Sequence, residues 1–95
     1  PGQLKLHYSP GIPVQMNRKR PQKNQALIGF GKNFVRGKNC FNLSKKGNLK
    51  EVANNLYKTM RKIKKGNFKS IAVIKIPNTE IGLAINDRLR KASNK

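Results

Sequence analysis

The chain has 95 residues, of which 22 are lysine or arginine and only three are acidic, giving a formal net charge of +19. A chain of this length forms one small domain with a modest core, which leaves little room for a deep active site. The charge favours a polyanion such as nucleic acid as the partner. AT-rich codon usage, which favours Lys, Asn and Ile, explains much of this positive charge equally well.

Cysteine content and hydropathy exclude several classes of protein. A single cysteine, Cys40, excludes an internal disulfide and a zinc site of the CxxC type. We expect it to be a half-buried free thiol in a reducing cytoplasm. No apolar run in the given sequence approaches the ~20 residues of a membrane span, and none has the pattern of a signal-peptide h-region. Because the first residue is Pro1 rather than Met, we expect the natural chain to begin upstream.

Three short strands and two basic loops are predicted in the first half of the chain. Residues Ile12–Met16 have strand character, and the apolar run Ala26–Phe30 is typical of a buried strand. Cys40–Leu43 forms a third short strand. The polar, proline-broken segment 17–25 and the glycine-punctuated segment 31–39 are predicted to be loops.

The best-defined element is a helix that begins after Asn48 and ends at Gly66. Asn48 is a suitable N-cap, and Glu51 is expected to form the reciprocal half of a capping box. Lysines on the opposite face repel one another, so tertiary packing must hold the helix. Its apolar stripe comprises Leu49, Val52, Ala53, Leu56, Tyr57, Met60 and Ile63.

A β-branched run, Ser70–Ile76, is predicted to be a central strand stopped by Pro77. Leu83–Ser93 is predicted to be the final helix. The alternation of helix and strand indicates an α/β fold with a mostly parallel sheet of about three or four strands and two main helices. The residues available for the core face of the last helix are Leu83, Ala84, Ile85, Leu89 and Ala92.

The residues that usually carry catalysis are scarce and scattered. Neither Glu51 nor Glu80 stands beside a partner suited to acid–base work, and Asp87 is expected to form a structural salt bridge with neighbouring bases. The "GFG" of residues 29–31 lacks the third glycine of a dinucleotide-binding loop and is read as a turn. We therefore expect no catalytic residue and no metal site in this chain.

Basic clusters are better candidates for binding. One cluster consists of Arg18, Lys19, Arg20 and Lys23, which are candidate contacts for RNA or phosphate. A second consists of Lys50, Lys58, Lys62 and Lys65 on the helix, which would also suit anionic lipid if the apolar face were free. No aromatic ladder for stacking bases accompanies them, and Phe30 and Phe41 are expected to fill the core.

Three stretches in order resemble the two-domain threonylcarbamoyl-AMP synthase family. "PGQLKLHYSP" is similar to that family's interdomain linker, with its Pro-Gly-Met-x-x-x-His-Tyr-x-Pro pattern. "NLSKKGNLKEVANNLYKTMRKI" resembles its Asn-Leu-Ser segment and the helix that follows, and "IGLAINDRLRKAS" resembles its C-terminal signature. The resemblance thus runs from the linker to the last helix.

The resemblance implies a small Rossmann-like C-terminal domain in residues 12–95, preceded by a linker in residues 1–11. The family's catalytic domain, which lies N-terminal to the linker, condenses ATP, threonine and bicarbonate into threonylcarbamoyl-AMP and pyrophosphate. That product supplies the N6-threonylcarbamoyl group of a tRNA adenosine. We expect this chain to be inactive alone and to bind no cofactor itself, with ATP and Mg²⁺ used by the full-length enzyme.

By the same resemblance the linker lies over the nucleotide pocket, and Tyr8 is the first candidate for an ATP contact. His7, Ser9 and the Pro1–Gly2 backbone are lesser ones. The sequence departs from the family at Gln3, where Met is usual, at Ile81, where Gly is frequent, and at Lys91, which replaces Arg.

Two alternatives stay open. The His-Tyr pair packs simply on its own domain, or the chain is a stand-alone basic module that binds tRNA or rRNA. An independent nucleotide-binding protein is a further, weaker alternative. Partners are therefore expected to be the catalytic domain, in the same or a separate chain, and tRNA, with no membrane.

Overall fold

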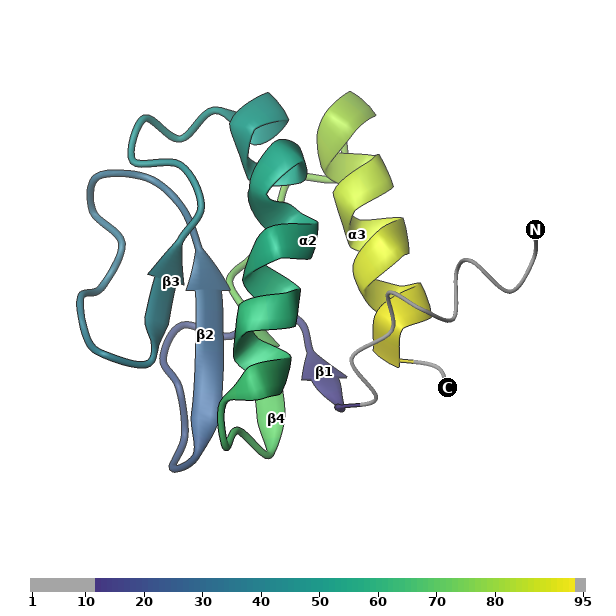
Figure 1. The fold of residues 1–95 in the computed structure, drawn as a ribbon. Helices are drawn as coiled ribbons and strands as arrows, with labels where there is room; N and C mark the ends of the chain where they lie inside the picture. Colours follow the sequence, from purple (N-terminus) through teal and green to yellow (C-terminus); the bar gives the residue numbers. More distant parts are fainter. Residues whose placement is uncertain (1–11, 94–95) are drawn as a thin grey trace.

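Four parallel strands form one sheet in the computed structural model, which describes residues 12–93. The elements in chain order are β1 (Val14–Gln15), β2 (Gln25–Gly29), β3 (Cys40–Asn42), α2 (Leu49–Lys65), β4 (Ser70–Val73) and α3 (Glu80–Ser93). The strand order is β1-β4-β2-β3, so β4 lies inside the sheet as predicted. Helix α2 lies over one face of the sheet, and α3 runs beside it next to β1 (Figure 1). The structure confirms an α/β fold of the small Rossmann-like kind.

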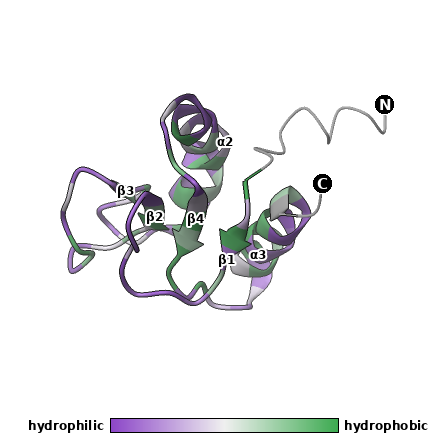
Figure 2. Ribbon diagram, turned by 90° about the horizontal axis from the view of Figure 1, so that it is seen from below, coloured by the Kyte–Doolittle hydropathy of each residue, from purple (hydrophilic) through white to green (hydrophobic). Residues whose placement is uncertain are grey.

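Strand β2 is buried along its whole length, because both faces of the sheet are covered. Successive side chains of a strand point to opposite faces, and Ala26 and Ile28 belong to the apolar core under the helices. On the other face, loops cover the strands (Figure 2). There Gln25 donates from Nε2 to Ser70 Oγ and to Gln15 Oε1, both at 2.9 Å, so it links β2 to the adjacent strand β4 and, beyond it, to β1.

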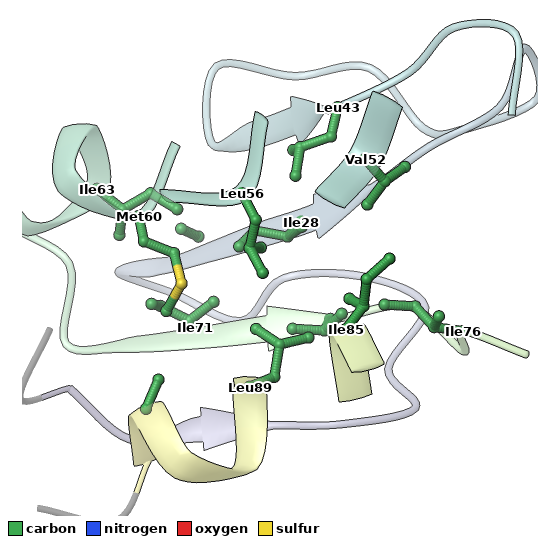
Figure 3. Close-up of a cluster of buried hydrophobic side chains, with 13 residues drawn as sticks. Ile28, Leu43, Val52, Leu56, Met60, Ile63, Ile71, Ile76, Ile85 and Leu89 are labelled. Carbon is green, nitrogen blue, oxygen red and sulfur yellow. The ribbon is translucent and has the colours of Figure 1, made fainter. Parts of the chain in front are cut away.

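Helix α2 is held to the sheet by four buried side chains, Val52, Leu56, Met60 and Ile63. They point into the space above the strands and toward α3, as Figure 3 shows. Burying one such side chain stabilises the fold by about 1.5–3 kcal/mol. Each pair of like charges on the exposed face costs only a few tenths of a kcal/mol. Packing therefore outweighs the repulsion among the lysines of this helix.

The start of α2 differs in one respect from the predicted capping box. Asn48 is the N-cap, and its Oδ1 accepts from the backbone N–H groups of Lys50 and Glu51 at 2.9 and 3.1 Å. The reciprocal bond predicted for Glu51 is wrong, because the buried Ser44 hydroxyl lies between the partners. Ser44 Oγ accepts from the Asn48 N–H at 3.0 Å and donates to Glu51 Oε1 at 2.5 Å.

The core face of α3 also differs from the prediction. The helix begins at Glu80 rather than Leu83, and its buried stripe comprises Gly82, Ile85, Asn86, Leu89 and Ala92. These positions follow the spacing of one helix face. Leu83, expected in the core, is 48% exposed, and Ala84 is exposed too. Both lie one or two residues out of phase with the stripe.

Two residues of α3 hold the segment that leaves β4. A Cβ atom at Gly82 would overlap the carbonyl oxygen of Pro77, so only glycine allows the helix to approach this backbone so closely. Asn86 is buried and donates from Nδ2 to the Ile76 carbonyl at 3.0 Å and to Asn78 Oδ1 at 3.2 Å. The exit from β4 is therefore tied to the last helix.

We predict that Gly82→Ala lowers the free energy of unfolding by about 2 kcal/mol. Alanine improves helix propensity by up to ~1 kcal/mol. The overlap with the Pro77 carbonyl costs more, about 1–3 kcal/mol for an overpacked site. Urea unfolding measures the difference. The control is Gly37→Ala in an exposed loop, where a Cβ meets only Cys40 Sγ at 3.4 Å and the change should stay within ~0.5 kcal/mol. Equal stability of the two variants would contradict this account.

We predict that Asn86→Ala costs about 1–3 kcal/mol of unfolding free energy, because it leaves the buried Ile76 carbonyl without its donor. Thermal unfolding followed by circular dichroism measures the loss. Asn54→Ala, at an exposed position of α2, is the matched control and should be close to neutral. If Asn86→Ala unfolds no earlier than Asn54→Ala, the amide does not hold the β4 exit.

Candidate functional site

A hollow of about 510 Å³, the carboxyl-edge cleft, lies where the chain leaves β1, β2 and β4. In open parallel sheets, ligands bind outside the carboxyl ends of the strands, where the connections to neighbouring elements diverge. Here the chain leaves β2 toward β3 and leaves β4 toward α3 beside β1 (Figure 1). The lining residues are Arg18, Lys19, Arg20, Phe30, Gly31, Lys32, Asn33, Phe34, Val35, Ile74 and Lys75.

Backbone hydrogen bonds hold the three walls of the cleft in place. The Arg18 N–H donates to the Val73 carbonyl at 2.9 Å, which ties the first loop to the end of β4. The Ile74 N–H donates to the Ile28 carbonyl at 3.1 Å, and the Gly31 N–H donates to the Ser44 carbonyl at 2.7 Å. The loops are thus anchored at the strand ends from which their side chains project.

The turn after β2 shapes one wall. Gly29 is the last residue of β2, and the chain turns from Gly31, whose φ of +99° favours glycine, so the strand-ending turn predicted for residues 29–31 begins two residues later than expected. A Cβ at Gly29 would overlap the Phe34 ring, which shows that this ring lies directly on the strand backbone. Phe30 and Phe34 are half-buried, and Phe30 packs against the core as predicted. The apolar floor of the cleft is therefore part of the fold.

The rim of the cleft is cationic, and no carboxylate lines it. The chain's three carboxylates all lie on the helices. Glu51 accepts from Ser44, Asp87 forms the predicted salt bridge with Lys91 at 3.2 Å, and Glu80 begins α3. The five cations of the rim, all exposed, are Arg18, Lys19, Arg20, Lys32 and Lys75. Such a concentration of one sign of charge attracts anions.

Of the residues predicted to contact RNA or phosphate, three meet in this cleft and one does not. Arg18, Lys19 and Arg20 line it, whereas Lys23 is exposed on the same loop outside the lining. Lys32 and Lys75 were missed, because neither belongs to a run of basic residues. Lys32 follows the predicted strand Ala26–Phe30. Lys75 fell inside the predicted strand Ser70–Ile76, but the observed β4 ends at Val73, so Lys75 stands just after it. The rule that ligands bind at the carboxyl ends of parallel strands is the signal for both lysines.

The candidate nucleotide contacts Tyr8, His7, Ser9 and Gly2, together with Pro1, lie outside the described residues. Their assignment stays a prediction. Within residues 12–93, no cluster of three or more His, Cys, Asp or Glu side chains is placed to hold a metal ion. In the same part of the chain, no helix is long and apolar enough to cross a membrane.

Cys40 is a half-buried free thiol at the start of β3, as predicted. Burial raises the pKa of this thiol above its ordinary value, which lowers the fraction of thiolate near neutral pH. Because the thiolate is the nucleophile, this environment gives Cys40 the properties of a structural cysteine.

We predict that iodoacetamide modifies native Cys40 several-fold more slowly at neutral pH than it modifies the urea-unfolded chain. The pH midpoint of the native reaction should lie above that of the unfolded one, since burial disfavours the thiolate. Mass spectrometry follows the reaction without ambiguity, because the chain has one cysteine. A native midpoint below the unfolded midpoint would contradict this environment.

Comparison with protein families matches residues 1–94 to the family described as threonylcarbamoyl-AMP synthase, C-terminal domain. Neither the curated proteins nor the solved structures give a match. The family match takes in the linker-like segment, the Asn-Leu-Ser region with its helix, and the whole of the final helix. The chain therefore belongs to the family of threonylcarbamoyl-AMP synthase C-terminal domains.

Proposed function

We propose that this chain serves as the C-terminal domain of a synthase that makes threonylcarbamoyl-AMP from ATP, threonine and bicarbonate. The product would supply the N6-threonylcarbamoyl group of tRNA adenosine. The single observation that carries the proposal is the family match, which extends over residues 1–94. Chemistry would take place on a catalytic domain in the same or a separate chain, with ATP and Mg²⁺ held there.

The proposed contribution of this chain to that reaction is a linker segment that lies over the ATP bound by the catalytic domain. The segment 1–10 carries the Pro-Gly and His-Tyr elements of the family's linker and falls within the matched range. Tyr8 offers an aromatic ring and a hydroxyl, one to pack on a base and one to hydrogen-bond to a phosphate or ribose. His7 and Ser9 would add polar contacts to the nucleotide, and the backbone of Pro1–Gly2 would approach it closely.

The C-terminal domain would anchor that linker. In the described residues, its signature serves the fold: Gly82 and Asn86 hold the exit of β4, and Arg88 stacks on the Tyr57 ring of α2 at 4.4 Å. A rigid attachment point supports the proposal, because a linker anchored at one end loses less conformational entropy when it binds over the nucleotide.

The test supplies the full chain to a catalytic domain of the same family, both as a fusion and as a separate protein. Pyrophosphate release and threonylcarbamoyl-AMP are measured with ATP, threonine, bicarbonate and Mg²⁺. We expect no turnover by the chain alone and a lower KM for ATP when the chain is present. Tyr8→Ala should raise the KM for ATP about tenfold, equivalent to ~1.4 kcal/mol of nucleotide binding.

Tyr8→Phe separates the ring from the hydroxyl and should recover most of the loss if the ring does the covering. Leu4→Ala, in the same segment, is the matched control and should leave the KM for ATP unchanged. Thermal unfolding of each variant guards against a loss of fold. The proposal would be overturned if neither the addition of the chain nor the Tyr8→Ala change altered the KM for ATP or the rate of product formation.

A further inference from the structure

We propose that the carboxyl-edge cleft binds a nucleic-acid strand through its phosphodiester backbone. This inference is independent of the proposed synthase function, because it rests on residues 18–75 and not on the segment 1–11. Five cations from three separate loops surround the cleft, and no carboxylate lines it. A negatively charged backbone is the ligand that such a rim attracts most strongly.

The extent of the positive surface favours a strand over a single nucleotide. The two loops that form most of the rim continue with exposed cations beyond the cleft, Lys23 on the first loop and Arg36 and Lys38 on the second. One triphosphate occupies only part of this surface. A strand that crosses the cleft places successive phosphates along both loops.

The apolar residues favour nucleic acid over lipid. A membrane-binding surface needs exposed apolar side chains beside its cations. The large apolar side chains that are most exposed in the described chain, Ile81 and Leu83, lie on α3 rather than at the cleft. Phe30 and Phe34 are partly buried in the fold, so the cleft contacts the backbone without a stacking ladder and has little preference for base sequence.

Bound phosphates would also reduce the electrostatic repulsion among the cations of the rim. The rim places like charges side by side without compensating acids, which disfavours the compact state. A phosphodiester backbone neutralises them and releases its counterions. Each neutralised phosphate contributes about −0.7 to the slope of log K against log salt for a single strand. The five rim contacts therefore give a slope of at least about −3.5 for the full chain, and contacts to the cations beyond the cleft make it steeper.

The experiment measures binding of the full chain to short labelled single-stranded RNA, by fluorescence anisotropy between about 50 and 200 mM salt. Two quadruple variants each remove one arginine and three lysines, so they carry the same net charge. The cleft variant is R18Q/K19Q/K32Q/K75Q. The control variant, K58Q/R61Q/K62Q/K64Q, alters exposed residues of α2 that do not line the cleft.

We expect the cleft variant to lose about 10²-fold in affinity at 0.1 M salt, and the slope of log K against log salt to become shallower by about 2.8, because four contacts are removed. The control should lose only a few-fold, because charges more than ~10 Å from the ligand are screened at this salt. All the altered side chains are exposed, so both variants should retain the fold, and circular dichroism checks this.

Parallel titrations with single-stranded DNA of the same sequence, ATP and tripolyphosphate identify the source of the phosphates. Similar affinity for RNA and DNA indicates recognition of the shared backbone, and a preference for RNA indicates contacts to the 2′-hydroxyl. Equal losses in the two quadruple variants would overturn the proposal, because net charge alone would then explain binding. Binding of tripolyphosphate as tightly as RNA, or no binding of the full chain to either strand, would overturn it too.

Discussion

The contact between helix α2 and the two inner strands is the interaction on which this small basic domain depends. A net charge of +19 disfavours any compact state, and a domain of 95 residues has few apolar side chains with which to oppose it. Val52, Leu56, Met60 and Ile63 supply the inner face of α2, and Ile28 and Ile71 receive them from β2 and β4. Each buried side chain contributes more than several like-charge pairs cost, so the lysines are tolerated at the surface.

The residues that pack the fold and the cations that line the cleft lie on different parts of the structure. The motif near the C-terminus that resembles the synthase family is occupied with packing. Gly82 allows close approach to Pro77, Asn86 holds the Ile76 carbonyl, and Arg88 covers Tyr57. The cations of the carboxyl-edge cleft belong to loops instead. The helices and strands therefore stabilise the fold, and the loops that connect them carry the side chains available to a ligand.

The sequence allowed most of the secondary structure to be predicted, and the reasons are physical. The β-branched run of β4 and the apolar stripe of α2 are strong signals: α2 lies where it was expected, and β4 begins at Ser70 as expected but ends at Val73 rather than Ile76. Leu83 was wrongly placed in the core, because the buried face of α3 follows Gly82, Ile85 and Leu89, and Leu83 lies off that face. Ser44 was missed at the start of α2, since its relay to Glu51 depends on a turn that brings residue 44 back to the helix.

The candidate site was only partly predictable. Arg18, Lys19 and Arg20 are adjacent in the chain and visible as a cluster, whereas Lys32 and Lys75 join them through the strand order. Strand order is a property of long-range pairing, which local sequence does not encode. The nucleotide-covering role of Tyr8 comes from resemblance alone, and it concerns a segment outside the described residues.

The position of β4 between β1 and β2 has a consequence for how the domain forms on the ribosome. Within residues 12–93, strand β1 pairs with β4 alone, and β4 is the last strand. Until residues 70–73 have been synthesised, β1 has no partner and the sheet cannot close. Closure then joins segments more than fifty residues apart, as Val14 pairs with Ile71, and such long-range pairing folds slowly. The basic loop between β1 and β2 therefore stays without an ordered sheet behind it until β4 is in place.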